Sequence, residues 1–318
     1  MTKKKYLKIL FVGCTTFSQK CINTILQLKN MRIVGIVTSN EMFDISYSAE
    51  PVKNYQHFDF KKSNNMKIPV FHLKSKMNDK ELFKSVSSLK PDIIIVAGWY
   101  HMIPKKWREL SPTYGLHASL LPKYTGGAPL VWALINNEKF TGITMFKIID
   151  GVDNGPIVGQ EKVRILKKET IKSLYMKIEQ VSQNVLKNVL PKIFFNNINL
   201  IDQDESLRTT FKQRKPSDGK INWGFDAEYI DRFIRAQTKP YPGAFTFFNN
   251  KKLIIWKADV INTINSLNCG EIKRIKNSYL IGCKKSSIVV KKIRYLNKDY
   301  SSNNMKEIFG CKNYTFNY

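Results

Sequence analysis

The stretch KILFVGCTTFSQKCINTILQLKNMRIVGIV, residues 8–37, decides the fold. Residues 8–12 are an apolar run that predicts a buried strand, and Gly13–Thr16 form a turn into a helix from about Phe17 to Lys29. Residues 32–37 predict a second strand. A strand, a helix and a strand in this order are typical of the start of a doubly wound parallel sheet. The turn contains no GxGxxG motif, so nothing here indicates a dinucleotide.

The same pattern continues along the chain. Residues 92–97 (DIIIVA) form an unbroken run rich in β-branched residues, which is typical of a central parallel strand. The segment GWYHMIP, residues 98–104, follows it at the end where such a sheet binds its ligand. From Glu169 to Phe195, apolar residues recur at helical spacing and predict a helix that packs on the core. We therefore predict an α/β fold with a Rossmann-like doubly wound parallel sheet.

The last third of the chain has a different pattern. A polar stretch, residues 196–206, predicts a linker. From Lys252 onward, short apolar runs alternate with turns, as in a small closed or half-open β barrel, and we expect an OB-like module there. The sequence thus predicts two domains: residues 1–200, and residues 201–318, which comprise the linker and the barrel.

Composition limits the class of protein. The hydrophobic content of 43% is enough for proper cores, and no run of about 18 apolar residues predicts a transmembrane helix. The basic amino-terminal end flows straight into the first predicted strand, which argues against a signal peptide and favours the cytoplasm. The five cysteines are an odd number without a CxxC pair, which favours reduced thiols over a disulfide framework or a zinc site. No metal is expected.

The net charge of +27 has two explanations. It would suit an acidic partner, such as a nucleic acid, a phosphorylated substrate or a membrane surface. The excess is mostly lysine spread along the chain, with abundant Asn and Ile, which an AT-rich genome would also produce. No Arg-rich or aromatic-interleaved segment stands out as a nucleic-acid stripe, so the sequence leaves both explanations open.

Between residues 117 and 160, titratable side chains, glycines and prolines crowd together at segment ends. His117 lies near a predicted strand end, and Asp153 lies in a turn after the strand-like residues 142–149. Two neighbouring parallel strands would bring the two side chains together. A carboxylate beside an imidazole favours the imidazolium, which can donate a proton near neutral pH, as acyl transfer requires. The alternative is a structural histidine and an aspartate that serves only the turn.

Three segments, HASLLPKYTGGAP (117–129), TGIT (141–144) and DGVDNGP (150–156), resemble the signature of the formyltransferases that use 10-formyltetrahydrofolate. This family includes glycinamide ribonucleotide, methionyl-tRNA and amino-sugar formyltransferases. RKPSDGKINW (214–223) and IRAQTKPYPGAF (234–245) resemble its carboxyl-terminal part. The resemblance implies that 10-formyltetrahydrofolate is the formyl donor, that His117 and Asp153 are catalytic, and that the chain can form a homodimer.

The resemblance also implies where the folate binds. The family cradles the pterin with the segment that corresponds to residues 98–104, and other groups line the same pocket. The implied cofactor-binding residues are His101, Met102, Ile103, Ser119, Leu120, Leu121, Pro122, Ile149 and Asp150.

One position departs from the family pattern. The family's catalytic residues read Asn-x-His and a later Asp, but Gly115 stands where the Asn is expected. A glycine has no side chain to donate to a developing oxyanion, and loss of one such donor typically lowers the rate about a hundred- to a thousandfold. A water or a neighbouring hydroxyl such as that of Ser119 could partly substitute.

The sequence leaves the identity of the formyl acceptor open between alternatives. Methionyl-tRNA enzymes of the family have a basic insertion after the second strand, whereas residues 39–55 contain no basic loop. These residues and PYPGAF are more similar to the amino-sugar branch, so we expect a nucleotide-linked deoxyaminosugar. The alternatives are initiator Met-tRNA, or a weakened relative that only binds folate, a nucleotide or RNA because of Gly115.

Overall fold

The computed structural model describes residues 5–43, 52–61, 67–74, 76–261, 267–310 and 314–316. Residues 41–65 are polar and aromatic with little periodicity, a composition that predicts a long loop, and they lie partly outside the described ranges. Within this stretch, a two-stranded antiparallel hairpin is formed by β3 (Met42–Phe43) and β4 (Val52–Lys53). In the part of the chain that the structure describes, no helix combines the length and the apolarity that a bilayer crossing requires.

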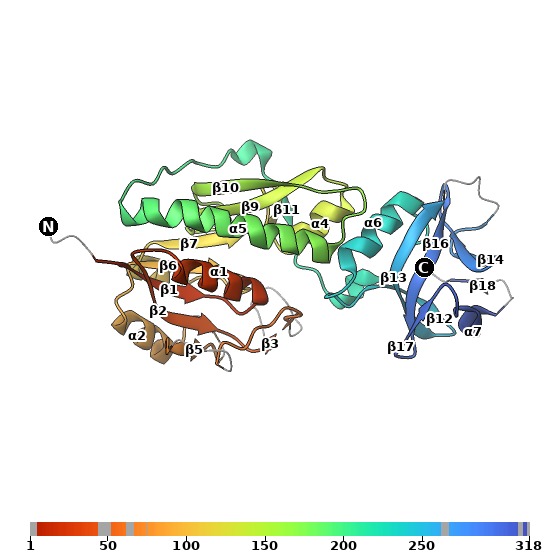
Figure 1. Ribbon diagram of the computed structural model, residues 1–318, viewed down its shortest axis with the longest axis horizontal. Helices are drawn as coiled ribbons and strands as arrows, with labels where there is room; N and C mark the ends of the chain where they lie inside the picture. Colours follow the sequence, from red (N-terminus) through yellow and green to blue (C-terminus); the bar gives the residue numbers. More distant parts are fainter. Residues whose placement is uncertain are drawn as a thin grey trace. The chain divides into compact units, whose positions relative to one another are not determined.

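A seven-stranded sheet with the order β10-β9-β7-β6-β1-β2-β5 forms the first fold element (Figure 1). Its strands are β1 (Leu7–Val12), β2 (Met31–Thr38), β5 (Val70–His72), β6 (Ile93–Ala97), β7 (Thr113–His117), β9 (Phe140–Lys147) and β10 (Ile157–Arg164). The strands from β7 to β5 are parallel, and β9 is antiparallel to both β7 and β10. The predicted parallel α/β sheet is confirmed, with an antiparallel edge added to it.

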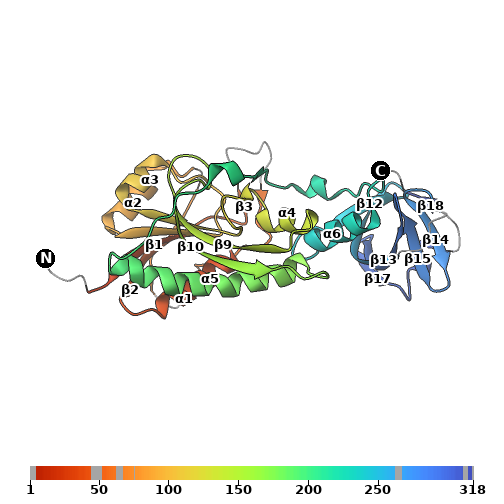
Figure 2. The same cartoon turned by 90° about the horizontal axis from the view of Figure 1, so that it is seen from above.

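Helices cover both faces of this sheet. Figure 2 shows α1 (Thr16–Leu26) and α5 (Ile171–Phe194) on one side, and α2 (Lys80–Ser88) and α3 (Lys105–Leu110) on the other. Successive strand residues point to opposite faces, so alternate residues of β1 and β6 join Val86 of α2 and Trp107 of α3 in one buried cluster. This layering explains why the β6 run reads as continuously apolar.

The amino-terminal end of α1 is closed by protein groups. Thr15 and Ser18 form a reciprocal capping box, and the backbone N–H of Thr16 donates to the carbonyl of Gln56 at 2.8 Å. A dinucleotide would need such amides for its pyrophosphate. The geometry therefore agrees with the missing GxGxxG motif.

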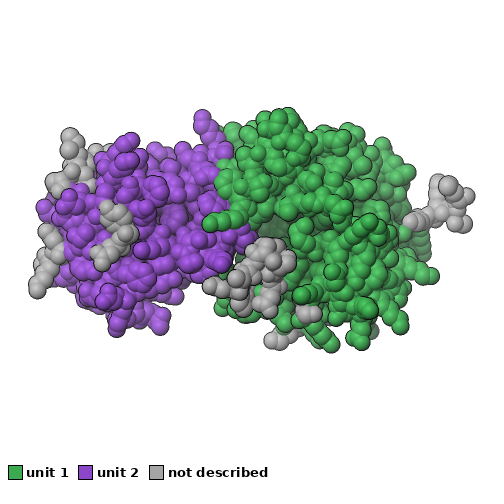
Figure 3. Space-filling model, turned by 180° about the vertical axis from the view of Figure 1, so that it is seen from behind, with its two compact units in different colours: residues 1–129, 140–164, 176–212 green, residues 130–139, 165–175, 213–318 purple. Residues whose placement is uncertain are grey.

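The chain divides into two compact units (Figure 3). Unit 1 contains residues 1–129, 140–164 and 176–212, and unit 2 contains residues 130–139, 165–175 and 213–318. The predicted domain boundary at residue 200 stays a prediction, but the contacts of residues 201–212 are with unit 1.

Unit 2 is built around a curled antiparallel sheet with the order β12-β13-β16-β15-β14-β18, and β17 also pairs with β16. Its strands are β12 (Ala244–Phe248), β13 (Lys251–Ile261), β14 (Glu271–Ile275), β15 (Ser278–Gly282), β16 (Ser287–Tyr295), β17 (Lys298–Ser301) and β18 (Tyr314–Thr315). Within the described ranges β12 and β18 do not pair, so the sheet is a half-barrel and the half-open form of the predicted module is confirmed. Helix α6 (Ala227–Gln237) packs on β13.

The remaining elements are short. They are α4 (Pro129–Ile135), α7 (Lys306–Phe309), β8 (Thr125–Gly126), β11 (Thr210–Phe211) and the 3₁₀ turns at Glu205–Leu207 and Pro216–Gly219. The pairing of β8 with β11 matters most, because it joins the chain after α5 to the loop that follows β7.

Candidate active site

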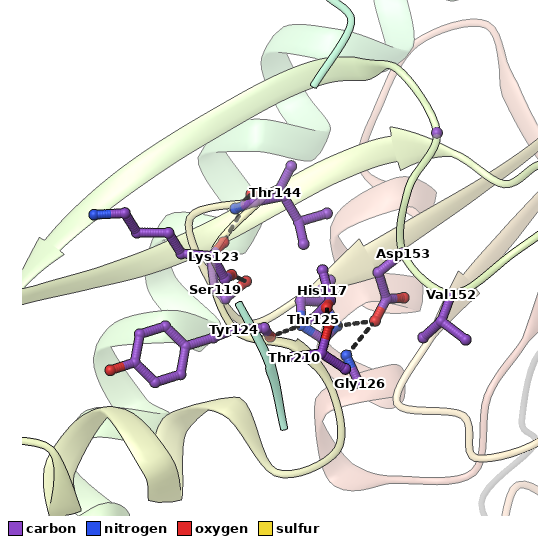
Figure 4. A network of polar contacts seen from close by, with 12 residues as sticks. His117, Ser119, Lys123, Tyr124, Thr125, Gly126, Thr144, Val152, Asp153 and Thr210 are labelled. Atoms are coloured by element: carbon purple, nitrogen blue, oxygen red, sulfur yellow. Dashed lines mark hydrogen bonds and ion pairs between the residues drawn. The ribbon is translucent and has the colours of Figure 1, made fainter. Parts of the chain in front are cut away.

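His117 and Asp153 meet in unit 1, although not in the way that the sequence predicts. His117 is the last residue of β7 and lies opposite Thr144 of β9. Because β9 is antiparallel to β7, the carboxyl ends of the two strands do not coincide, and the predicted parallel arrangement is wrong. The turn between β9 and β10 instead carries Asp153 back, and its Oδ2 lies 3.5 Å from Nδ1 of His117 (Figure 4).

The second ring nitrogen of His117 defines the tautomer. Its Nε2 lies 2.7 Å from the backbone carbonyl oxygen of Tyr124. A carbonyl oxygen only accepts, so Nε2 carries a proton and donates it. Nδ1 is therefore a base in the neutral ring and a donor in the imidazolium. Asp153 is fixed as well, because its Oδ2 accepts the backbone N–H of Gly126 at 2.8 Å.

The turn after His117 is held rigidly by polar side chains from the sheet. Thr144 Oγ1 donates to the carbonyl of Ser119 at 2.7 Å, and Gln160 Nε2 donates to the carbonyl of Leu121 at 3.1 Å. The hydroxyl of Ser119 is fully buried and donates to the carbonyl of Lys123 at 2.7 Å. Its only proton is therefore used, and the hypothesis that Ser119 replaces the missing oxyanion donor is wrong.

Gly115 is covered by an aromatic ring. It lies two residues before His117 on the same face of β7 and directly opposite Phe146 on β9. A Cβ at residue 115 would lie 2.9 Å from Cε1 of Phe146 and 3.2 Å from Cδ1 of Ile148. Phe146 is buried. Apolar side chains therefore fill the position to which an Asn would project.

The loop after β6 forms an aromatic wall. Gly98 has φ +62°, and a Cβ there would lie 2.1 Å from Oγ1 of Thr15, so only glycine fits. The ring of His101 lies 5.1 Å from that of Phe43 and 5.2 Å from that of Trp99. Nε2 of His101 and Nε1 of Trp99 are buried and have no hydrogen-bond partner within the described ranges. Burial also lowers the pKa of His101, which keeps the ring neutral.

The other predicted cofactor-binding residues differ in accessibility. Met102 and Ile149 have exposed side chains. Ile103 and Leu121 are buried, and Ile103 belongs to the core cluster under α2 and α3. The remaining three are Leu120 and Pro122, which are half-buried, and Asp150, whose carboxylate pairs with Arg108. The cofactor assignments stay predictions.

No group of three potential metal ligands occurs within the residues that the structure describes. Cys14, Cys21 and Cys283 are free and buried, and burial raises the pKa of each thiol, so these cysteines are poor nucleophiles.

Several residues around the His117–Asp153 pair are absent from the sequence prediction. Phe146 acts through the pairing of β7 with β9, which no short window of sequence encodes. Tyr124 acts through its backbone carbonyl, which does not depend on the type of side chain. Gln203 lies in a stretch whose composition indicates only a linker, and no local signal marks it.

The fold and the paired His117 and Asp153 define the class: an α/β protein whose site can carry out acid–base chemistry at a carbonyl. The sequence matches the formyl transferase family over residues 7–190 and the C-terminal domain of formyl transferases over residues 214–305. The first match alone covers more than half of the chain, and the chain belongs to the formyl transferase family.

Individual relatives are similar to different extents. The bifunctional polymyxin resistance protein ArnA of Wigglesworthia glossinidia brevipalpis is 40% identical over 237 residues, which are 74% of this chain and 36% of the relative. The chain thus spans about a third of the length of that protein.

Two solved structures share the fold. An N-formyltransferase from Helicobacter canadensis, solved with folinic acid and dTDP-3-aminofucose, has a TM-score of 0.64 at 20% identity and covers 92% of this chain and 100% of its own. The methionyl-tRNA formyltransferase of Clostridium thermocellum has a TM-score of 0.55 at 22% identity and covers 80% of this chain and 94% of its own. The expected homodimer and the cytoplasmic location stay predictions.

Proposed function

We propose that the protein is an N-formyltransferase that moves a formyl group from 10-formyltetrahydrofolate to the amine of a nucleotide-linked deoxyaminosugar. The observation that carries the proposal is the His117–Asp153 pair, with a separation of 3.5 Å and a histidine tautomer set by the Tyr124 carbonyl. The relative solved with folinic acid and dTDP-3-aminofucose supports the choice of both substrates.

The roles of the two residues follow from this geometry. The substrate amine attacks the formyl carbon, a C–N bond forms, and negative charge develops on the formyl oxygen. Protonated His117 donates a hydrogen bond through Nδ1 to this oxygen, and it then gives its Nδ1 proton to the folate nitrogen as the bond from that nitrogen to the formyl carbon breaks. Asp153 stabilises the imidazolium and accepts the proton that the amine loses.

The aromatic wall fits the formyl donor. The neutral ring of His101 and the indole of Trp99 have polar atoms that a bound pterin would satisfy, because this heterocycle presents donors and acceptors along one edge. Phe43 and the tilted rings beside it supply aromatic faces against which a heterocycle can pack. We assign His101, Met102 and Ile149 to the donor side on this basis, together with the backbone of the Ser119–Pro122 turn.

The segment after β2 favours a sugar nucleotide over a tRNA. Glu41 pairs with Lys53 at 3.3 Å across the β3–β4 hairpin, and residues 44–51 contain two acidic side chains and no Lys or Arg. A clamp on the phosphates of a tRNA acceptor stem would require the opposite charge. The free, buried thiols of unit 1 suit the reducing cytoplasm, which we propose as its location.

A second candidate is methionyl-tRNA formyltransferase. The net charge of +27 favours it, because a polyanion would find many cationic side chains. The shared fold with the Clostridium thermocellum enzyme is compatible with it. The covered Gly115 position supports the third candidate, a catalytically weakened relative that binds without turnover.

A formyl-transfer assay distinguishes the candidates. Purified protein and 10-formyltetrahydrofolate are offered dTDP- or UDP-linked aminosugars, or charged initiator Met-tRNA, and the formylated product is measured by mass spectrometry. The proposal expects turnover with a sugar nucleotide alone, and none with the His117→Gln variant. Turnover with Met-tRNA alone would replace it by the second candidate. Folate binding without turnover of either acceptor would favour the third.

A further inference from the structure

Residues 201–211, which we call the return segment, come back to the catalytic turns after α5. Ile201 and Ile157 exchange backbone hydrogen bonds of 2.9 and 2.7 Å, and β11 pairs in parallel with β8. Gly126 has φ +87°, and a Cβ there would lie 2.4 Å from the carbonyl oxygen of Phe211. The return segment therefore packs against the site more closely than any side chain at residue 126 would allow.

The return segment binds the turn that carries Asp153. Nε2 of Gln203 donates to the carbonyls of Asp153 and Gly155, at 2.8 and 2.7 Å. Asp153 has φ +50°, a left-handed conformation that costs a non-glycine residue roughly 1–2 kcal/mol. The two acceptors are the carbonyl of this strained residue and that of Gly155, so one amide spans the carboxyl-terminal side of the turn and holds Asp153 in the conformation that directs its carboxylate to His117.

The same segment binds the residue that sets the histidine tautomer. The backbone N–H of Tyr124 donates to Oγ1 of Thr209 at 2.9 Å, and the ring of Phe211 stacks on that of Tyr124 at 4.8 Å. Figure 4 shows the Tyr124 ring turned away from the His117–Asp153 pair, so only its backbone carbonyl serves the site. Both catalytic side chains therefore depend on contacts from one stretch of 11 residues, 201–211.

We propose that Gln203 is a positioning residue of the active site: its amide holds the Asp153 turn and thereby keeps the carboxylate of Asp153 facing His117. The inference rests on the proposed function. Gln203 touches no reacting atom in this scheme and acts only through the backbone of residues 153 and 155. A displacement of about 1 Å at a catalytic group can lower a rate about a hundredfold, so this hold has catalytic consequences.

The test compares Gln203→Met, which keeps the length of the side chain but cannot donate, with Asp202→Asn, a change at the neighbouring exposed residue, whose side chain makes no hydrogen bond to the turn within the described ranges. We expect Gln203→Met to lower kcat about 10- to 100-fold, with KM for both substrates within about twofold and an unchanged melting temperature. Asp202→Asn is expected to match the wild type. A folded Gln203→Met protein with wild-type kcat would overturn the proposal.

A second readout works without turnover. In protein labelled with ¹⁵N-histidine, the ring-nitrogen signals of His117, assigned with His117→Gln, report the neighbouring carboxylate. We expect Gln203→Met to move these signals in the same direction as Asp153→Asn does. If the wild type formylated nothing and the signals still moved, the proposed function would fail and the positioning role would stand. Unmoved signals would refute the positioning role.

Discussion

The parallel strands and the antiparallel edge of the same sheet differ in what they contribute. β1 and β6 are buried almost throughout, β2 is buried from Gly35 to Thr38, and the alternate faces of the sheet are covered by helices. The edge formed by β9 and β10, together with the carboxyl end of β7 beside it, carries His117, Thr144, Gln160 and the turn with Asp153. The parallel strands provide a scaffold, and the edge, together with the return segment, provides the polar groups. Stability and activity should therefore respond to substitution in different places.

Among substitutions in the antiparallel edge, Asp153→Asn should lower kcat the most. The amide keeps the shape of the carboxylate but cannot stabilise the imidazolium or accept a proton, so kcat should fall about 10²- to 10⁴-fold. Asp153 is one-fifth exposed, and the melting temperature should change little. Steady-state kinetics and thermal denaturation of the same preparation check both statements. A normal kcat would remove Asp153 from the mechanism.

Ile95→Ala in β6 should lower the stability of the protein and leave its kcat almost unchanged. Ile95 is fully buried at the centre of the parallel strands, and its truncation should lower the free energy of unfolding by about 2–5 kcal/mol. The kcat of the folded fraction should remain within about twofold of the wild type. Ile95→Val is the matched control, with an expected loss of about 0.5–1.5 kcal/mol. Urea denaturation provides the values, and a larger effect on kcat than on stability would contradict the division between scaffold and edge.

Gly115→Asn tests the covered donor position. The new side chain would meet the ring of Phe146, and such overpacking should destabilise the fold by about 1–3 kcal/mol without raising kcat. With Phe146→Ala in the same chain the space opens, so the double variant should be more stable than the sum of the two single changes predicts. Its kcat should also exceed that of Phe146→Ala alone. Strict additivity in a double-mutant cycle would show that the two positions do not compete for space.

The smallest expected effect is on the pH dependence of stability. Burial lowers the pKa of His101 below its ordinary value of about 6.5, so the unfolded chain binds more protons than the fold between these two values. Stability should therefore fall as the pH is lowered from about 6.5 through the folded pKa. Burial lowers the pKa of His72 in the same direction. His101→Phe should flatten this decline in part, as measured by urea midpoints from pH 7.5 to 5, and an unchanged decline would exclude a contribution of His101.

Local sequence patterns were enough to predict the strands and helices of the scaffold. The apolar runs of β1, β2 and β6 and the helical spacing of α5 lie within short windows of sequence, where strand and helix periodicities are direct consequences of backbone geometry. The half-open antiparallel module was also predictable, because its short runs and turns alternate regularly.

The site was predictable only where a motif marked it. His117 and Asp153 lie in the segments that resemble the family, but the antiparallel direction of β9 depends on long-range pairing that no short window encodes. The contact between Gly115 and Phe146 follows from that pairing. Gln203 was unpredictable for a further reason, since polar residues in a linker and polar residues that hold a catalytic turn have the same composition.

The return segment also affects where chimaeras between members of this family can be joined. The two family matches leave residues 191–213 unassigned, and Gln203 and Thr209 lie inside that interval. A chimaera joined after Lys212 would exchange the half-barrel and keep the native hold on Asp153. A chimaera joined near Asn196 would insert a foreign segment beside the catalytic turn, and would alter the enzyme while nominally exchanging only its partner domain. The crossover point in this interval thus decides whether catalysis is inherited with the first domain or with the second.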